Sequence, residues 1–267
     1  MLTQTMIRIK NRTHHLHFAG EQIVGWCRDY IQRTASSPVR ILDIGLGSAR
    51  DLLAIREACP GAELDLHGIE CQEIHIQHAR RCGIATYSLN IEKDPLPVED
   101  GYFDIILSNH VIEHTKEIYW IFAEISRALK PNGMAVIGCP NLGSWHNRVA
   151  LLFGKEPPCM KLLGPHVRGI TKSGFRSMIE QGGFFKMVGY NGSNFYPLPP
   201  GPNKFFAAML PTLCASHHFV LRRTDKSGTF IEVLDLPIPG IGDTPYHRGA
   251  SATSIHAEEP VAVGASV

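Results

Sequence analysis

Hydrophobic and polar residues follow two different periods along the first half of the chain. Short apolar runs end at turn residues, and the stretches between them repeat their apolar positions every three or four residues. We interpret the runs as strands at residues 40–44, 62–70, 84–89 and 103–107, and the stretches between as helices at residues 51–59 and 73–82. Strands that alternate with helices indicate an α/β protein built on a parallel sheet.

The second half continues this pattern with longer breaks. A helix after residue 117 is expected to stop at Lys130-Pro131-Asn132-Gly133, because proline cannot continue a helix and the next residues tolerate a positive φ. A fifth strand follows, and the remaining predicted elements are a helix at residues 171–181 and strands at residues 184–190 and 216–222.

These elements suit a single domain over residues 1–224. Residues 1–39 are predicted to form a helical cap, and two insertions, residues 142–170 and 191–215, interrupt the regular pattern. The tail, residues 225–267, keeps some apolar positions at first and ends in small and polar residues that predict partial disorder. Its first half is expected to pack on the domain or on a partner.

The first predicted strand runs directly into a glycine-rich turn, with Asp43 before Gly45, Leu46 and Gly47. Glycine has no Cβ, so such a loop bends sharply and approaches a ligand closely. Glu70 ends the next strand, where a carboxylate can accept hydrogen bonds from both hydroxyls of a ribose. The two features predict a nucleoside-containing cofactor.

The loop departs from the dinucleotide pattern G-x-G-x-x-G/A. Arg50 stands where the third glycine or alanine is needed, and Ala49 comes one position earlier. The form D-x-G-x-G-x-A resembles motif I of class I S-adenosylmethionine-dependent methyltransferases. Residues 96–141 are also similar to the methyltransferase-11 type of that class, in L-P-x-x-D-x-x-F-D, in the E-H pair at Glu113 and His114, and in L-K-P-x-G.

This resemblance implies a Rossmann-like α/β fold with a mostly parallel seven-stranded sheet, an antiparallel last strand and helices on both faces. It implies S-adenosylmethionine as the cofactor, with the acid of motif I near the amino-acid end and an Asn and an apolar residue at the adenine. The cofactor-binding residues that we predict on this basis are Asp43, Gly45, Leu46, Gly47, Glu70, Cys71, Asn90, Ile91 and Asn109.

Methyl transfer to an oxygen or nitrogen atom also needs the acceptor to lose a proton, and histidine is a common base for this step. His110 and His114 follow the fourth strand, where the methyl group is expected, while His146 and His166 lie in the first insertion. We predict His114, then His146, and also His110, as base or orienting group. A purely structural role for the histidine of the E-H pair, with catalysis by proximity alone, is an equal alternative.

The composition of the chain disfavours several classes of binding partner. The net charge is +1 without a basic block, which disfavours nucleic acid, and no apolar run is long enough to span a membrane. Without a signal-peptide core the protein is expected to be cytoplasmic, as a monomer or homodimer. Seven cysteines form no C-x-x-C pair and His14, His15 and His17 lack a nearby acidic or thiol ligand, so no metal site is predicted.

The function predicted from the sequence is methylation of a small-molecule acceptor at oxygen or nitrogen, in a biosynthetic pathway. Two alternatives stay open. One is a non-catalytic cofactor-binding or regulatory protein, because residues 140–154 also resemble a methyltransferase-like family associated with methionine biosynthesis. The other is a thiol or metalloid methyltransferase, for which the only support is the number of cysteines.

Overall fold

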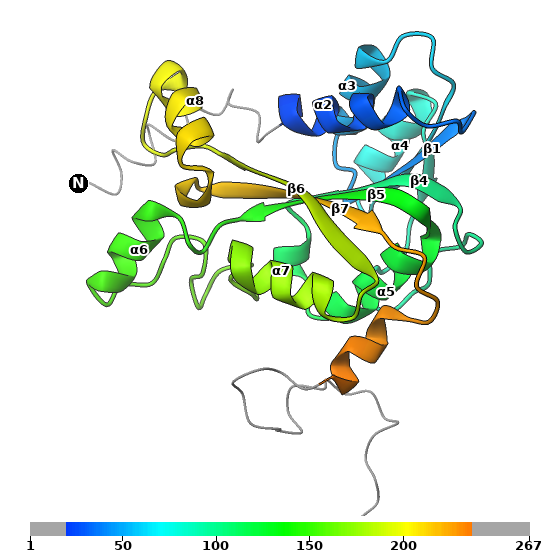
Figure 1. Cartoon of the computed structure of the whole chain (residues 1–267). Helices are drawn as coiled ribbons and strands as arrows, with labels where there is room; N and C mark the ends of the chain where they lie inside the picture. Colours follow the sequence, from blue (N-terminus) through cyan, green and yellow to red (C-terminus); the bar gives the residue numbers. More distant parts are fainter. Residues whose placement is uncertain (1–19, 237–267) are drawn as a thin grey trace, which may run out of the picture.

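The computed structural model describes residues 20–236 and contains a seven-stranded sheet between two layers of helices (Figure 1). The strands are β1 (Val39–Ile44), β2 (Leu64–Ile69), β3 (Ala85–Tyr87), β4 (Phe103–Asn109), β5 (Leu129–Pro140), β6 (Phe185–Ser193) and β7 (Ser216–Arg223). Their order is β3-β2-β1-β4-β5-β7-β6. Strand β7 pairs antiparallel with both β5 and β6, and the other pairs are parallel, which confirms the predicted mostly parallel sheet with an antiparallel last strand.

Both faces of the sheet are covered, because the central strands carry apolar side chains on each side. Ile41, Ile105 and Leu107 pack under one layer of helices, whereas Leu42 and Ile106 pack under the other. The first layer consists of α2 (Gly20–Ile31), α3 (Arg50–Ala58) and α4 (Glu73–Arg81). The second consists of α5 (Ile118–Ala128), α7 (Lys172–Gln181) and the 3-10 helix η3 (Phe230–Asp235).

The strand order reverses between β1 and β4, and this point positions the site. Ile44 at the end of β1 pairs with Ser108, and Asn109 at the end of β4 pairs with Gly138 of β5. The carboxyl ends of the three parallel strands therefore lie side by side. In open α/β sheets, ligands bind in the crevice beyond such a reversal.

Each predicted insertion contains a helix that the sequence did not indicate, α6 (Trp145–Leu152) and α8 (Pro200–Met209). Both lie at the end of the molecule where β5 ends, at the left of the view (Figure 1). The prolines at the start of α8 have the composition of a loop, which is why no helix was predicted there. Proline is nevertheless compatible with the first turn of a helix, and α8 begins at these residues. The insertions are thus partly ordered by helices of their own.

The helix ends two residues before the predicted stop at residues 130–133. Helix α5 ends at Ala128 and β5 begins at the next residue, while Asn132 takes the positive φ of 64°. The register of β4 with β5 shifts between Phe103 and Ile105, beside this turn. Residues 129–133 therefore form the irregular start of β5.

The two ends of the predicted domain are described only in part. Helix α2 lies within the predicted cap of residues 1–39 and packs on one face of the sheet, and His14, His15 and His17 lie outside the described residues. In the tail, η3 buries Phe230 and Val233 against the layer of α5, and residues 237–267 lie outside the described part. Between residues 20 and 236, no helix is long and apolar enough to cross a membrane.

Candidate functional site

The loop after β1 needs small residues at several positions. Gly45 has a φ of 78° and Gly47 a φ of 50°, a region that favours glycine. A Cβ on Gly45 would overlap the side chain of Val111, so this glycine is also required by its neighbour. Leu46 is buried, and Ala49, with a φ of 59°, precedes the first turn of α3. The backbone therefore makes a narrow turn at the end of β1.

Asp43 places a carboxylate at the end of β1, 4% exposed. Burial, together with the nearby carboxylates of Asp51 and Glu70, raises its pKa well above the ordinary value. None of the ion pairs in the described part of the chain involves Asp43. A buried acid without a cation suits a ligand that carries one, such as the ammonium of an amino acid.

Glu70 follows β2 and faces the glycine loop. Its Oε2 accepts a hydrogen bond from the Gly47 N–H at 2.8 Å, and its Oε1 accepts from the N–H groups of Cys71 (2.8 Å) and Gln72 (2.9 Å). Burial opposes ionisation, but these backbone hydrogen bonds outweigh it and leave the pKa of Glu70 below its ordinary value. An ionised carboxylate is thus fixed next to the loop, where a ribose could be bound through its hydroxyls.

The remaining predicted cofactor residues lie around this loop. Asn109 donates from Nδ2 to Asp51 Oδ2 at 3.1 Å, which joins the end of β4 to α3. Asn90 Oδ1 accepts from the Glu92 N–H at 3.0 Å, so its carbonyl is already used once in a local turn. Ile91 packs beside the core, whereas Cys71 is exposed. These residues fit a nucleoside with its base beyond β3, and their roles stay predictions.

Two of the three predicted catalytic histidines gather at the end of β4. His110 has a φ of 58°, and its Nδ1 lies 3.2 Å from Oε1 of Glu113. Glu113 and His114 belong to the 3-10 helix η1 (Ile112–His114), and the Nε2 of His114 lies 3.9 Å from the same oxygen. The side chain of Glu113 is 2% exposed and that of His114 is 43% exposed. A buried carboxylate thus lies between two imidazoles.

His146, the third candidate, has a different environment. It lies on α6, where its ring packs edge-on against Trp145 and Tyr196, and its Nε2 lies 3.4 Å from Ser144 Oγ. Burial lowers the pKa of His146, so the ring is neutral at pH 7. These three neighbours belong to the two insertions.

Several buried polar groups near this end of the sheet had no role in the sequence analysis. His217 and His218 of β7 are fully buried, and both nitrogens of each ring have no hydrogen-bond partner within residues 20–236. Burial and then the charge of His110 lower both pKa values to about 3. Two adjacent histidines directly before Phe219, Val220 and Leu221 in a predicted strand were the available signal, because both faces of a central strand are usually apolar.

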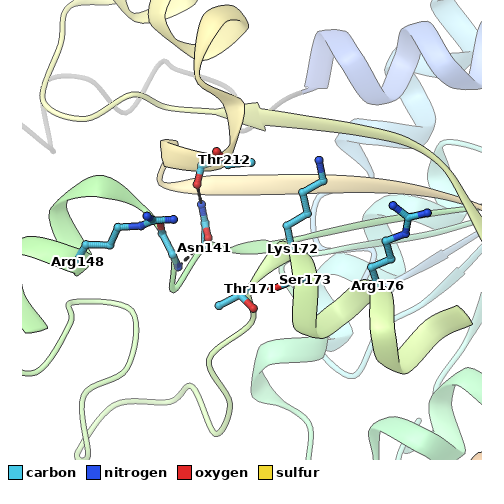
Figure 2. Close-up of a pocket in the computed structure, with 8 residues that line it drawn as sticks. Asn141, Arg148, Thr171, Lys172, Ser173, Arg176 and Thr212 are labelled. Atoms are coloured by element: carbon cyan, nitrogen blue, oxygen red, sulfur yellow. Dashed lines mark hydrogen bonds between the residues drawn. The ribbon is translucent and has the colours of Figure 1, made fainter. Parts of the chain in front are cut away.

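A cavity of about 490 Å³ opens beside α7 (Figure 2). It is lined by Asn141, Gly143, Arg148, Thr171, Lys172, Ser173, Arg176 and Thr212. Thr171 caps α7 by accepting a hydrogen bond from the Gly174 N–H at 3.2 Å, and helix N-termini favour anions. The three cationic side chains of the lining, Arg148 from α6 and Lys172 and Arg176 from α7, therefore suit an anionic group.

Each of the three cationic side chains that line this cavity contacts a neighbouring group of the protein. Arg148 Nε donates to the Gly143 carbonyl at 2.7 Å, and Arg176 pairs with Glu180 at 2.8 Å. The ammonium of Lys172 lies 4.1 Å from the ring centre of Tyr190. Lys172 and Arg176 extend in the same direction from α7 (Figure 2). The sequence analysis did not single out these cations, because isolated basic residues on a helix are ordinary surface positions.

Comparison with known proteins agrees with this geometry. A family described as "Methyltransferase domain" matches residues 42–137, which include the glycine loop and η1. The ubiquinone biosynthesis O-methyltransferase of Bartonella bacilliformis is 25% identical over 132 residues, which cover 48% of this chain and 52% of that protein. The chain spans between 30% and 52% of the length of the curated relatives that it matches.

Solved structures share the fold at low identity. A methyltransferase from Archaeoglobus fulgidus, described as dependent on S-adenosylmethionine (SAM), aligns with a TM-score of 0.52 at 16% identity, over 76% of this chain and 94% of that one. The [4+2]-cyclase SpnF aligns with a TM-score of 0.52 at 15% identity, over 75% of this chain and 81% of that one. Residues 42–137 therefore match a methyltransferase domain, in a chain that has the fold of methyltransferases that depend on S-adenosylmethionine.

Proposed function

We propose that the protein transfers the methyl group of S-adenosylmethionine to an oxygen or nitrogen atom of a small molecule. The observation that carries this proposal is the juxtaposition of the cofactor cradle, Asp43 and Glu70 at the ends of β1 and β2, with the acid–base pair His110 and Glu113 just beyond β4. A cofactor bound at the reversal of strand order would present its methyl group near β4.

His110 is the base that we take first. Its Nδ1 lies 3.2 Å from the buried Glu113 carboxylate, which holds the proton on Nδ1 and makes Nε2 the basic nitrogen. The enzyme then needs to align the acceptor with the departing sulfur, and the histidine removes the acceptor proton as the new bond forms. His114 and His146 stay alternatives, with His146 better placed to orient an acceptor between the two insertions.

The acceptor is proposed to carry an anionic group. The cavity beside α7 combines Arg148, Lys172 and Arg176 with a helix N-terminus, and residues of both predicted acceptor insertions line it. The similarity to an O-methyltransferase favours oxygen as the methylated atom. We therefore infer a biosynthetic hydroxy acid or a phosphorylated alcohol as the class of acceptor, acted on by a cytoplasmic monomer or homodimer.

The test begins with cofactor binding and then measures turnover. Calorimetry of the full chain should show binding of S-adenosylmethionine and S-adenosylhomocysteine but not of NAD. A panel of small acceptors, matched in pairs with and without a carboxylate or phosphate, is then screened for release of S-adenosylhomocysteine. We expect turnover with anionic members of the panel.

The variant His110→Ala should lower kcat by about 10²- to 10⁴-fold, the usual contribution of a general base, while the Kd for S-adenosylmethionine changes little. His75→Ala on α4, outside the site, serves as the matched control and should retain full turnover. If His110→Ala keeps the turnover of the unchanged protein, His110 is not the base, and the same assay is repeated with His114→Ala and His146→Ala.

A second candidate function is cofactor binding without methyl transfer. The shared fold of a [4+2]-cyclase favours it, because that fold supports reactions other than methylation. Tight binding of S-adenosylmethionine with no release of S-adenosylhomocysteine from any acceptor would select this alternative. The thiol or metalloid alternative stays open with the number of cysteines as its support, and the group of neighbouring metal-ligating side chains found within residues 20–236 adds none, because it contains no cysteine.

A further inference from the structure

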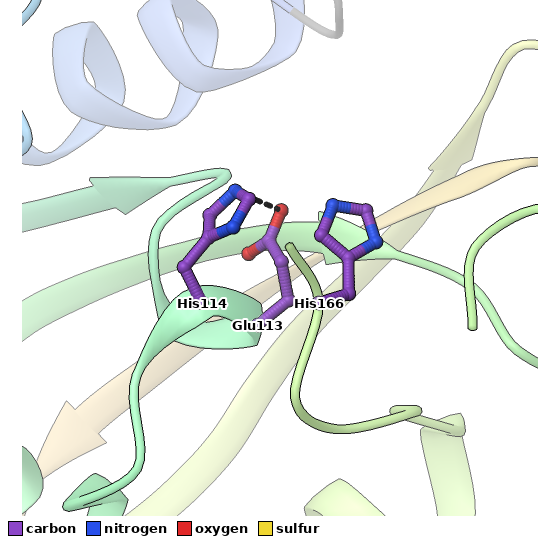
Figure 3. A group of neighbouring side chains, drawn as sticks. All are labelled: Glu113, His114 and His166. Carbon is purple, nitrogen blue, oxygen red and sulfur yellow. Dashed lines mark ion pairs between the residues drawn. The ribbon is translucent and has the colours of Figure 1, made fainter. Parts of the chain in front are cut away.

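We infer that Glu113, His114 and His166 form a binding site for a divalent transition-metal ion such as Zn²⁺. One ligating atom of each side chain lies within 4.8 Å of the others. Figure 3 shows the Glu113 carboxylate between the two imidazole rings, which come from η1 and from the first insertion. The centres of the two rings are 4.8 Å apart. Three side chains of metal-binding type thus converge on one point.

The second nitrogen of each ring is oriented by the backbone. His114 Nδ1 lies 3.2 Å from the Pro165 carbonyl oxygen, and His166 Nδ1 lies 2.8 Å from the Cys159 carbonyl oxygen. A carbonyl oxygen can only accept, so each Nδ1 carries the proton and each Nε2 keeps its lone pair. This is the arrangement by which proteins fix histidine ligands of metal ions. Both rings are therefore prepared to bind through Nε2.

The segment that carries His166 is attached to η1 by the backbone. The Val167 N–H donates to the Glu113 carbonyl oxygen at 2.9 Å, and Arg168 donates to the Thr115 carbonyl oxygen at 3.0 Å. The residue after His166 is thus bonded to the residue before His114. These bonds do not depend on an ion, so the three side chains are brought together by the fold itself.

Glu113 supplies an independent reason to expect a ligand. Its side chain is 2% exposed, and its buried Oε2 has no hydrogen-bond partner among the described residues. An ionised carboxylate that is buried with an oxygen left unsatisfied is costly, and a cation removes that cost. His110, whose Nδ1 lies 3.2 Å from Oε1, holds the other oxygen in place. A cation bound by the carboxylate, whose Oε1 lies 3.9 Å from His114 Nε2, would offset that cost.

The donor set selects the class of ion. Two imidazole nitrogens and one carboxylate oxygen suit Zn²⁺ and similar transition metals, whereas Mg²⁺ and Ca²⁺ prefer oxygen ligands. Ligands of a tetrahedral Zn²⁺ site lie roughly 3.3 Å apart, given bonds of about 2.0–2.1 Å. The His114 Nε2 and Glu113 Oε1 atoms are 3.9 Å apart, so small side-chain rotations would complete the geometry. Three protein ligands leave a coordination position open.

If the protein methylates a hydroxyl group, as in the proposed function on which this step rests, the open coordination position could bind that hydroxyl. An acceptor hydroxyl bound to the ion would lose its proton more readily, because a bound Zn²⁺ stabilises the resulting oxyanion. His114 is 43% exposed, so a small molecule can reach this side of the cluster. The ion would then act beside His110 at the end of β4.

The experiment is a calorimetric titration of Zn²⁺ into the full, untagged chain after treatment with a chelator. The variant His14→Ala/His15→Ala/His17→Ala removes the competing histidines of the N-terminal segment, and it should still bind one ion per chain. Adding His166→Ala or Glu113→Gln to that background should weaken the affinity by more than about tenfold, since loss of an outer hydrogen-bond partner alone costs that much. His75→Ala in the same background is the control and should change nothing.

The outcomes separate the metal site from methyl transfer. Co²⁺ in place of Zn²⁺ should give the intense visible absorption of a tetrahedral site, lost with His166→Ala. Equal affinity in the His166→Ala, Glu113→Gln and control variants, or loss of binding when only the three N-terminal histidines are replaced, overturns the proposal. Binding of Zn²⁺ by a protein with no methyl transfer supports the metal site and refutes the proposed function.

Discussion

Asp43 shows how one residue can strengthen ligand binding while it lowers the stability of the protein without ligand. Its carboxyl group is 4% exposed and close to Asp51 and Glu70, and both effects raise its pKa. The ionised form is therefore unfavourable until a cation is bound. The ammonium of S-adenosylmethionine would supply this cation, so that cofactor binding and ionisation of Asp43 are coupled.

The variant Asp43→Asn tests this coupling. It should weaken binding of S-adenosylmethionine by at least about tenfold, or 1.4 kcal/mol, because a charge-assisted contact is lost. In the unchanged protein, affinity should rise as the pH rises through the raised pKa of Asp43, and in the variant this dependence should disappear. Calorimetry from pH 5 to pH 8 measures both quantities.

The same substitution should make the empty protein more stable. A carboxyl whose pKa is raised by folding contributes stability below its unfolded pKa and loses it as the pH rises through the folded value. At pH 8 the raised pKa of Asp43 therefore opposes folding, and an amide, which does not ionise, has no such effect. Thermal unfolding at pH 8 without ligand measures this gain. Unchanged affinity together with unchanged stability would contradict the role assigned to Asp43.

At the level of elements, α7 links stability to the cavity. Thr171 is its N-cap and accepts a hydrogen bond from the Gly174 N–H at 3.2 Å, while the same residue lines the cavity. Thr171→Ala should lower the free energy of unfolding by about 1 kcal/mol, since a backbone donor loses its partner. Thr171→Ser keeps the hydroxyl and should restore most of the stability. Urea denaturation of the three proteins measures the difference, and equal stability of Ala and Ser variants would show that the cap contributes nothing.

The elements predictable from the sequence are those whose pattern is local. Ile105, Ile106 and Leu107 form a continuous apolar run, and the structure buries all three in β4 between two layers of helices. Helix α8 was missed because its first residues, Pro-Gly-Pro, have the composition of a loop, and packing against β6 decides otherwise. A helix that depends on distant contacts leaves only a weak local signal.

The same distinction applies to the candidate site as a whole. Asp43 and Glu70 follow strands, so a motif and the topology rules for parallel sheets are enough to bring them together. His166 lies 53 positions from Glu113 in an irregular segment, and bonds from the residues beside it, such as that from the Val167 N–H, bring it to η1. His217 and His218 reach the site because β7 pairs with β5, in a strand order that no local pattern contains. Motif residues are thus predictable, and residues brought in by long-range pairing are not.

The buried histidines of β7 give the whole molecule a defined response to acid. Burial and the charge of His110 lower the pKa values of His217 and His218 to about 3, from an ordinary value near 6.5. The unfolded chain therefore binds two more protons than the folded chain between these pH values, so stability falls as the pH falls. Each histidine lowers the free energy of unfolding by up to about 1.4 kcal/mol for each unit that the pH falls, because one pKa unit corresponds to this energy.

Replacing one of these histidines should halve this part of the acid response. His217 packs against the aromatic rings of Tyr190 and Phe219, so His217→Phe supplies an apolar ring that does not titrate. The free energy of unfolding from urea denaturation, plotted between pH 6 and pH 4, should then slope less steeply by up to about 1.4 kcal/mol per pH unit. His75→Ala on α4 is the control and should keep the original slope. A slope unchanged by His217→Phe would mean that His217 accepts a proton in the folded protein, and with it that the end of the sheet around β7 admits water.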